Sequence, residues 1–199
     1  MTACEALESW TDSVCAQPEG HSGMHDDGEG HLWRDARHRR EAVIVDIDGT
    51  LCDVSGILHH LPDYDAFHQA SVHCPPVDQV LLWCDEQVAR GRELIVVTGR
   101  KYTHGDLTIA WLEQHMRHPF HGPFMRGEDD ARPDTEVKAQ IARQLREDHG
   151  FDVVAAIDDR PSVIRLWHRT LSIPTTVVYR RDWLLNGETY HDLLDLEWI

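Results

Sequence analysis

The chain has 199 residues, and its 19 Lys and Arg residues stand against 35 Asp and Glu residues, which gives a formal net charge of −16 at pH 7. This length suits one domain of ordinary size with a short appendage. The acidic balance argues against a protein that coats nucleic acid, or sits on an anionic membrane, through bulk charge.

The lysine content excludes one large class of phosphate-transfer enzymes. The chain has only two lysines, Lys101 and Lys138, and neither is followed by Ser or Thr. A P-loop requires a lysine followed by Ser or Thr. The sequence therefore contains no P-loop, and a kinase of that type is excluded.

The five cysteines and the N-terminal residues indicate in which cellular compartment the protein is found. No two cysteines have C-x-x-C spacing, which is typical of reduced thiols in a cytoplasmic protein. Glu5 and Glu8 stand where a signal peptide would carry basic residues, and no apolar run approaches membrane length. We expect a cytoplasmic protein with neither a signal peptide nor a membrane span.

In chain order, residues 1–40 come first and contain few clustered aliphatic side chains. This composition predicts a disordered or loosely packed N-terminal tail, with one short helix over 5–14. From Glu41 on, the sequence contains apolar runs, and residues 41–199 are expected to form the folded domain.

Apolar runs alternate with helical patterns through this domain. Helical spacing begins near residue 77 and ends at Gly91, and further helices are expected at Asp106, at Asp134 as an N-cap residue, and over 161–168. Short buried strands are predicted at 42–45, 94–97, 153–157 and 176–179, with a further one near 123–126. Such alternation is typical of an α/β fold with a mostly parallel sheet, helices on both faces, and a site at the carboxyl ends of the strands.

The first strand runs directly into two acids. Asp46 and Asp48 are separated by one residue, so their side chains would point to the same face just past the sheet edge. Two close carboxylates repel each other unless a cation holds them or one is protonated. Taken alone, this run is also compatible with a calcium loop or an acidic turn.

The ends of other predicted strands also carry polar and charged groups that can bind a phosphate or a metal ion. Thr98, Gly99 and Arg100 end the second strand and offer a hydroxyl, a free backbone N–H and a guanidinium to an anion. Asp158 and Asp159 form a second acid pair, and a lysine lies one turn into the third helix. Together these groups predict a site for Mg²⁺ and phosphate.

The order and spacing of these groups resemble the four motifs of the haloacid dehalogenase (HAD) superfamily. The motifs are present as DIDGT at 46–50, TGR at 98–100, Lys138, and IDDR at 157–160. The resemblance implies a Rossmann-like HAD fold, and residues 41–199 would then be a HAD-like phosphatase domain.

A closer resemblance is to the 3′-phosphatase domain of phage-type polynucleotide kinase–phosphatase. It is carried by RPDTEVK at 132–138 and, more loosely, by PDYD at 62–65. That family has a basic residue in the flap ahead of its Pro-Tyr-Asp, whereas no Lys or Arg occurs at 41–89 here and His59 and His60 occupy this region.

The resemblance covers residues 41–170 and leaves little room for a cap domain. The intervals 48–98 and 98–138 each hold too few residues for one. We therefore expect an essentially capless enzyme with a short flap, whose open site admits bulky substrates.

The resemblance also implies roles for individual residues. Asp46 would be the nucleophile and Asp48 the general acid and base, with Thr98 and Lys138 as further catalytic residues. The cofactor would be Mg²⁺, bound by Asp46, the backbone carbonyl of Asp48, Asp158 and Asp159. Substrate binding would fall to the following residues: Gly99, Arg100, Arg132 and Asp134.

The predicted function is that of a Mg²⁺-dependent phosphomonoesterase that works through an aspartyl-phosphate and removes 3′-phosphates from polynucleotide ends. Its partner would be a nucleic-acid end or a nucleotide. A nucleotide (dNMP or NMP) phosphatase is an alternative that the acidic composition would suit. A non-catalytic HAD-like binding module is a second alternative.

Overall fold

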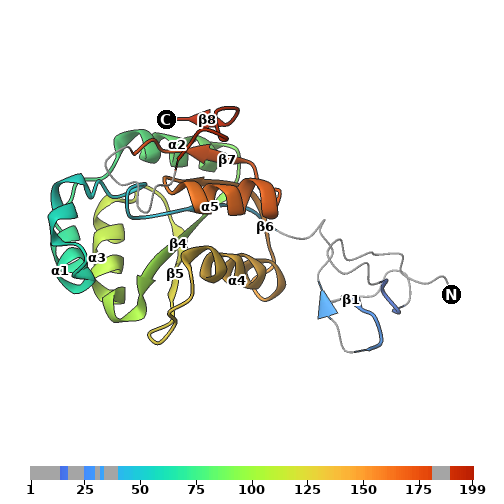
Figure 1. The fold of residues 1–199 in the computed structure, drawn as a ribbon. Helices are drawn as coiled ribbons and strands as arrows, with labels where there is room; N and C mark the ends of the chain where they lie inside the picture. Colours follow the sequence, from blue (N-terminus) through green and yellow to red (C-terminus); the bar gives the residue numbers. More distant parts are fainter. Residues whose placement is uncertain (1–13, 18–24, 30–31, 34–39, 181–188) are drawn as a thin grey trace.

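The computed structural model describes residues 14–17, 25–29, 32–33, 40–180 and 189–199. A six-stranded sheet forms the centre of the molecule, and every neighbouring pair of its strands is parallel (Figure 1). In spatial order the strands are β5 (Phe120–Arg126), β4 (Glu93–Lys101), β3 (Arg40–Val45), β6 (Phe151–Asp158), β7 (Thr175–Val177) and β8 (Glu197–Trp198).

Helices cover both faces of this sheet, as the sequence predicts. The α-helices are α1 (Tyr64–Ser71), α2 (Asp78–Ala89), α3 (Gly105–His115), α4 (Asp134–Glu147) and α5 (Pro161–Arg165). Short 3₁₀ helices, η2 (Ser55–His60) and η3 (Tyr102–His104), precede α1 and α3, and a π-helical turn, η4 (Leu166–Thr170), follows α5.

The alternation of side chains along β3 builds two separate cores. Val43 and Val45 pack in one cluster with buried residues of α1, α2 and α3. Ala42 and Ile44 point to the other face and pack with α4, α5 and η4. Successive strand residues face opposite ways, so a strand covered on both sides reads as the unbroken apolar run seen at 42–45.

Several predicted boundaries are confirmed and others need correction. Gly91 has φ +82°, a conformation that favours glycine, and it ends the α2 region as expected. Asp134 was expected to be an N-cap, but that prediction is wrong because Pro133 is the N-cap and no side chain caps α4. The helix predicted over 161–168 is α-helical only to Arg165, and β7 ends at Val177 rather than at residue 179.

The N-terminal region is only partly described. β1 (His25–Asp26) pairs antiparallel with β2 (Leu32–Trp33), and the amide of Ala16 donates to the carbonyl of Asp26 at 2.7 Å. Most of the helix expected over 5–14 lies outside the described residues. The division into a loose tail and a folded domain stays a prediction.

No helix in the described part of the chain combines the length and the apolar character that crossing a bilayer requires.

Trp83 links α2 to the far edge of the sheet. Its indole Nε1 donates to Thr176 Oγ1 at 3.1 Å, and that hydroxyl donates to Glu197 Oε2 at 3.0 Å. The tryptophan is buried, so its side chain contributes both packing and a hydrogen bond to the joint between α2, β7 and β8.

We expect Trp83→Phe to lower the free energy of unfolding by about 1–3 kcal/mol, because it removes a buried hydrogen bond and leaves unfilled volume. Leu82→Ala is the matched control, since Leu82 is 55% exposed on the same helix. Its effect should stay within about 0.5 kcal/mol. Urea unfolding followed by far-UV circular dichroism measures the free energy of unfolding of both variants. Equal effects of the two variants would contradict the structural role of Trp83.

Candidate active site

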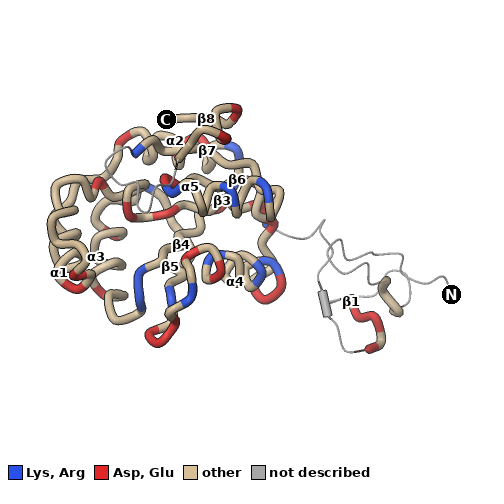
Figure 2. The backbone as a smooth tube through the Cα atoms, viewed as in Figure 1, with Lys and Arg blue, Asp and Glu red and all other residues tan. Residues whose placement is uncertain are grey.

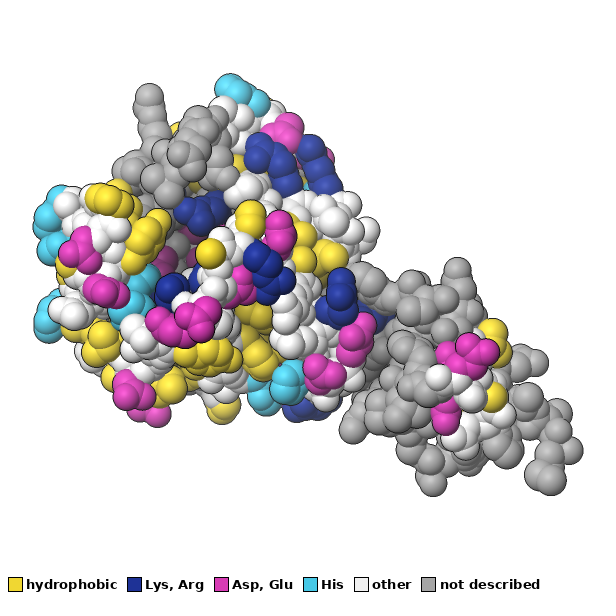
Figure 3. All heavy atoms as spheres, turned by 60° about the horizontal axis from the view of Figure 1, so that its bottom comes forward, with side chains coloured by type: hydrophobic (Ala, Val, Ile, Leu, Met, Phe, Trp, Pro, Cys, Tyr) yellow, Lys and Arg dark blue, Asp and Glu magenta, His cyan; other side chains and the backbone are white. Residues whose placement is uncertain are grey.

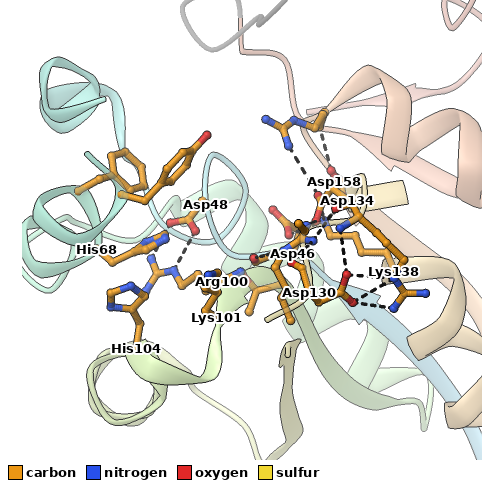
Figure 4. A pocket seen from close by; sticks show the side chains of 18 of the residues that line it. Asp46, Asp48, His68, Arg100, Lys101, His104, Asp130, Asp134, Lys138 and Asp158 are labelled. Atoms are coloured by element: carbon orange, nitrogen blue, oxygen red, sulfur yellow. Dashed lines mark hydrogen bonds and ion pairs between the residues drawn. The ribbon is translucent and has the colours of Figure 1, made fainter. Parts of the chain in front are cut away.

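Three central strands bring the predicted residues to one edge of the sheet. The chain leaves β3 toward β4 on one side and returns through α4 to β6 on the other side of β3. Ligand sites in such sheets form where the strand order diverges, outside the carboxyl ends of the strands. A pocket of about 440 Å³ lies there, lined by residues that follow or end β3, β4 and β6 (Figure 4).

Three buried carboxylates and one buried ammonium form the deepest part of this pocket. One oxygen each from Asp46, Asp158 and Asp159 lies within 4.8 Å of the others. Lys138 is only 2% exposed, and its Nζ donates to Asp46 Oδ1 at 2.7 Å and to Asp158 Oδ2 at 2.9 Å. Burial alone would lower the pKa of Lys138, but the charges of Asp158 and Asp46 raise it well above the usual value.

A single ammonium does not balance the charge of this acid cluster. Burial, with the neighbouring acids, raises the pKa of Asp46 to about 7 and that of Asp159 well above its usual value. Asp159 Oδ2 is buried and has no hydrogen-bond partner among the described residues. Carboxylate oxygens are the ligands that Mg²⁺ prefers, so these residues fit a divalent cation.

Three further side chains hold the acid cluster in place. Thr50 donates to Asp159 Oδ1 at 3.2 Å, and Trp167 Nε1 donates to Asp158 Oδ2 at 3.2 Å. The Tyr190 hydroxyl donates to the backbone carbonyl of Asp159 at 2.6 Å. Sequence analysis missed the contacts of Trp167 and Tyr190, because no local pattern places these side chains beside the acids.

Asp48 lies in the other half of the pocket, beside Arg100 (Figure 4). The Arg100 guanidinium donates to both carboxylate oxygens of Asp48, from Nε at 2.8 Å and from Nη2 at 2.5 Å, and also donates to Thr108 Oγ1. Burial raises the pKa of Asp48, but Arg100 outweighs burial and leaves that pKa below its ordinary value. The arginine predicted to contact substrate thus holds the predicted acid and base.

The end of β4 is held against the start of α4. Gly99 approaches Asp134 so closely that a Cβ atom on it would lie 2.5 Å from Asp134 Oδ1. Arg126 donates to the Gly99 carbonyl at 3.0 Å and to Asp134 Oδ1 at 3.1 Å, so Asp134 belongs to this brace instead of capping its helix. Thr98 is buried, and its Oγ1 accepts from the amide of Arg100.

Basic residues at the mouth of the pocket are paired but accessible. Arg132 is half exposed and contacts Asp130 and Gln140, and Lys101 lies 4.0 Å from Glu128. Figure 2 shows basic residues at the ends of β4 and β5 and acidic residues in the loop that follows β5. Figure 3 shows Lys and Arg side chains around a hollow, with acidic side chains among them.

Helix α1, which begins within the PDYD sequence at 62–65, supplies aromatic rings to the pocket. Tyr64, Phe67 and His68 of α1 line it, together with His104 of η3. His59 and His60, the flap histidines noted in the sequence, lie on η2 and are not among the residues that line the pocket. No sequence pattern singled out His68 or His104.

Comparison with known proteins gives a consistent result. Residues 40–183 match the family model of the polynucleotide kinase PNKP phosphatase domain. The chain is 29% identical over 147 residues to a protein of Autographa californica nuclear polyhedrosis virus that is named as a bifunctional polynucleotide kinase/RNA ligase. The match covers 72% of this chain and 20% of that protein.

Two solved structures share the fold. One is from the Pnkp1/Rnl/Hen1 RNA repair complex, with a TM-score of 0.60 and 23% identity over 69% of this chain and 42% of that chain. The other is the class C acid phosphatase of Bacillus anthracis, with a TM-score of 0.50 and 16% identity over 63% of this chain and 54% of that chain. The chain spans less than two thirds of the length of each of these proteins.

Gly49 offers a direct test of how tightly the acid cluster is packed. Its φ is +84°, and a Cβ atom there would lie 2.2 Å from Asp159 Oδ2. We expect Gly49→Ala to cost about 1–3 kcal/mol of stability through backbone strain, and to displace the Asp159 carboxylate. Gly56→Ala is the control, because its Cβ would meet nothing within 4 Å. Thermal unfolding of both variants checks this, and a Gly49→Ala protein as stable as Gly56→Ala would refute the packing.

Proposed function

The chain belongs to the polynucleotide kinase PNKP phosphatase domain family and is a phosphatase of the HAD type, and from this premise we propose that it removes 3′-phosphates from polynucleotide ends. The observation that carries the proposal is the placement of Asp46 at the end of β3, where the Lys138 ammonium holds its carboxylate at 2.7 Å. Asp48 lies two residues further on, at the opposite side of the same pocket.

In the first step, a carboxylate oxygen of Asp46 forms a bond to phosphorus while the ester bond to the sugar oxygen breaks. Thr98, the amide of Gly99 and Lys138 would hold the oxygens of the phosphoryl group. Lys138 suits this role because it is fixed by two hydrogen bonds and stays charged. Donors fixed in advance stabilise developing charge without further reorganisation.

Asp48 would give its proton to the leaving sugar oxygen and then take one from water. Arg100 lowers the pKa of Asp48, which suits the second role. A phosphate dianion bound beside Asp48 would raise the same pKa through like-charge repulsion, which suits the first role. In the second step water attacks phosphorus, the bond to Asp46 breaks, and inorganic phosphate leaves.

The acid cluster would hold Mg²⁺ through Asp46, Asp158 and Asp159, with the backbone carbonyl of Asp48 as a further ligand. When bound, the cation would neutralise phosphoryl oxygens and keep Asp46 ionised. The buried, unpartnered Oδ2 of Asp159 supports this assignment.

A polynucleotide end is the substrate that the small size of this interval and the relatives favour. Between β3 and β4 the described chain holds two α-helices and one 3₁₀ helix but no cap domain, so this interval places no second fold over the pocket. Relatives named for kinase, ligase and RNA repair make a 3′-phosphatase chemically sensible, because ligation requires a free 3′-hydroxyl.

The proposal is tested by phosphate release in the presence of Mg²⁺. The substrates are 3′-phosphorylated and 5′-phosphorylated oligonucleotides, each as DNA and as RNA, and 3′- and 5′-mononucleotides. We expect the highest kcat/KM on the 3′-phosphorylated strand. A preference for free mononucleotides would contradict the proposal and identify a nucleotide phosphatase.

Asp46→Asn is the blank for this assay, and we expect it to lower kcat by about 10³-fold or more, because the amide cannot attack phosphorus. Its circular dichroism spectrum should match that of the parent protein. Residual activity near the parent value would exclude Asp46 as the nucleophile.

Lys138→Ala tests the electrostatic part of the mechanism. We expect kcat to fall by about 10²–10³-fold, because a phosphoryl oxygen loses a fixed cation in a buried site. Lys101→Ala is the matched control, since this is the only other lysine and it is 47% exposed at the pocket mouth. The control should change kcat by less than about threefold. Similar losses in both variants would show that bulk charge, and not the buried position, matters.

A further inference from the structure

Four ring side chains that line the pocket take no part in the mechanism above. They belong to Tyr64, Phe67, His68 and His104, and we call them the aromatic wall. The ring centroids of His68 and His104 are 4.6 Å apart, those of Phe67 and His68 are 5.2 Å apart, and those of Tyr64 and His68 are 6.1 Å apart. The four rings therefore form one contiguous cluster, of which Tyr64 is the exposed member.

The aromatic wall lies on the side of the pocket where the leaving group departs. Figure 4 shows His68 and His104 beside Asp48 and Arg100, across the pocket from Lys138 and its acids. A general acid must reach the leaving oxygen, so the position of Asp48 marks the side to which the sugar is expelled. The group attached to that oxygen would then lie near the aromatic wall.

The chemistry of the wall suits a neutral ring. Burial lowers the pKa of His68 to about 4, so its imidazole is uncharged at neutral pH. Asp65 lies 3.2 Å from His104 Nε2 and adds negative charge at this rim. The Lys138 side of the pocket thus suits the phosphate, and the rings beside Asp48 and Arg100 suit a neutral aromatic group (Figure 4).

Two details indicate a ligand at this place. His68 is 7% exposed, and its Nδ1 is buried without a hydrogen-bond partner among the described residues. A buried polar atom left unpaired is costly, and a neutral imidazole offers one donor and one acceptor. Tyr64 lines the pocket and is 54% exposed, so its side chain is accessible to a ligand.

We propose that the aromatic wall is the binding subsite for the terminal nucleoside, in which Tyr64 stacks on the base and His68 hydrogen-bonds to the nucleoside. The subsite rests on the proposed phosphatase function and deepens it, because it makes the enzyme selective for phosphate esters of nucleosides over small aliphatic esters. Stacking on an aromatic side chain tolerates any base, so the subsite would select a nucleoside without selecting a sequence.

The test compares two exposed tyrosines. Tyr64→Ala removes a ring of the wall, while Tyr102→Ala removes a ring that is 61% exposed and is not among the residues lining the pocket. Each variant is assayed on a 3′-phosphorylated oligonucleotide, on a 3′-mononucleotide and on glycerol phosphate. We expect Tyr64→Ala to raise KM about tenfold on both nucleoside substrates, with kcat nearly unchanged and kcat/KM on glycerol phosphate unaffected.

His68→Gln provides a second variant, with the exposed His73→Gln as its control. We expect it to weaken the same two nucleoside substrates and to spare glycerol phosphate. An equal loss on all three substrates, or no loss on any, would overturn the subsite. The outcome is separable from the fate of the proposed function: a wild-type preference for mononucleotides would refute the polynucleotide substrate, and a selective loss in Tyr64→Ala would still support the subsite.

Binding to an inactive protein gives a readout that is independent of turnover. Fluorescence anisotropy of a labelled 3′-phosphorylated oligonucleotide on Asp46→Asn should show about tenfold weaker binding when Tyr64→Ala is added, and no change when Tyr102→Ala is added. Equal affinities of the two double variants would overturn the proposal.

Discussion

The structure depends on one buried ammonium among buried acids. Lys138 holds Asp46 and Asp158, which arrive on the ends of two neighbouring strands and would otherwise repel each other. Removing one partner from such a buried arrangement leaves an uncompensated charge, which is far costlier than losing a surface ion pair. The position of α4, which carries Lys138 over β3 and β6, is therefore tied to the chemistry of the site as well as to the apolar core beneath it.

The acid cluster around Lys138 also carries an excess of negative charge that this one ammonium does not neutralise. Asp159 keeps a buried oxygen that has no hydrogen-bond partner among the described residues. Burial, and after it the charges of Asp158 and Asp48, raises the pKa of Asp46. A divalent cation held by these acids would remove this excess and leave Lys138 free to meet the substrate. Across the pocket, Arg100 keeps Asp48 apart from this cluster, so the two acids of one motif experience opposite environments and can take different roles.

Much of this arrangement could be predicted from the sequence, because parallel strands deliver their next residues to one edge. The apolar run at 42–45 and the acids after it were enough to place Asp46, and the scarcity of lysine made Lys138 conspicuous. What local patterns could not give are contacts between distant segments. The bond from Tyr190 to Asp159 spans 31 residues, and the brace from Arg126 to Asp134 turned an expected cap into a partner of an arginine.

The central claim, that Asp46 attacks phosphorus and Lys138 holds it in place for that attack, is tested most directly by the stereochemical course of the reaction. The substrate would be an oligonucleotide whose 3′-phosphorothioate is chiral through ¹⁶O and ¹⁸O, hydrolysed in water enriched in ¹⁷O. Two successive in-line displacements, first by Asp46 and then by water, predict overall retention of configuration in the released thiophosphate. Inversion would show that water attacks the substrate directly and would contradict the account.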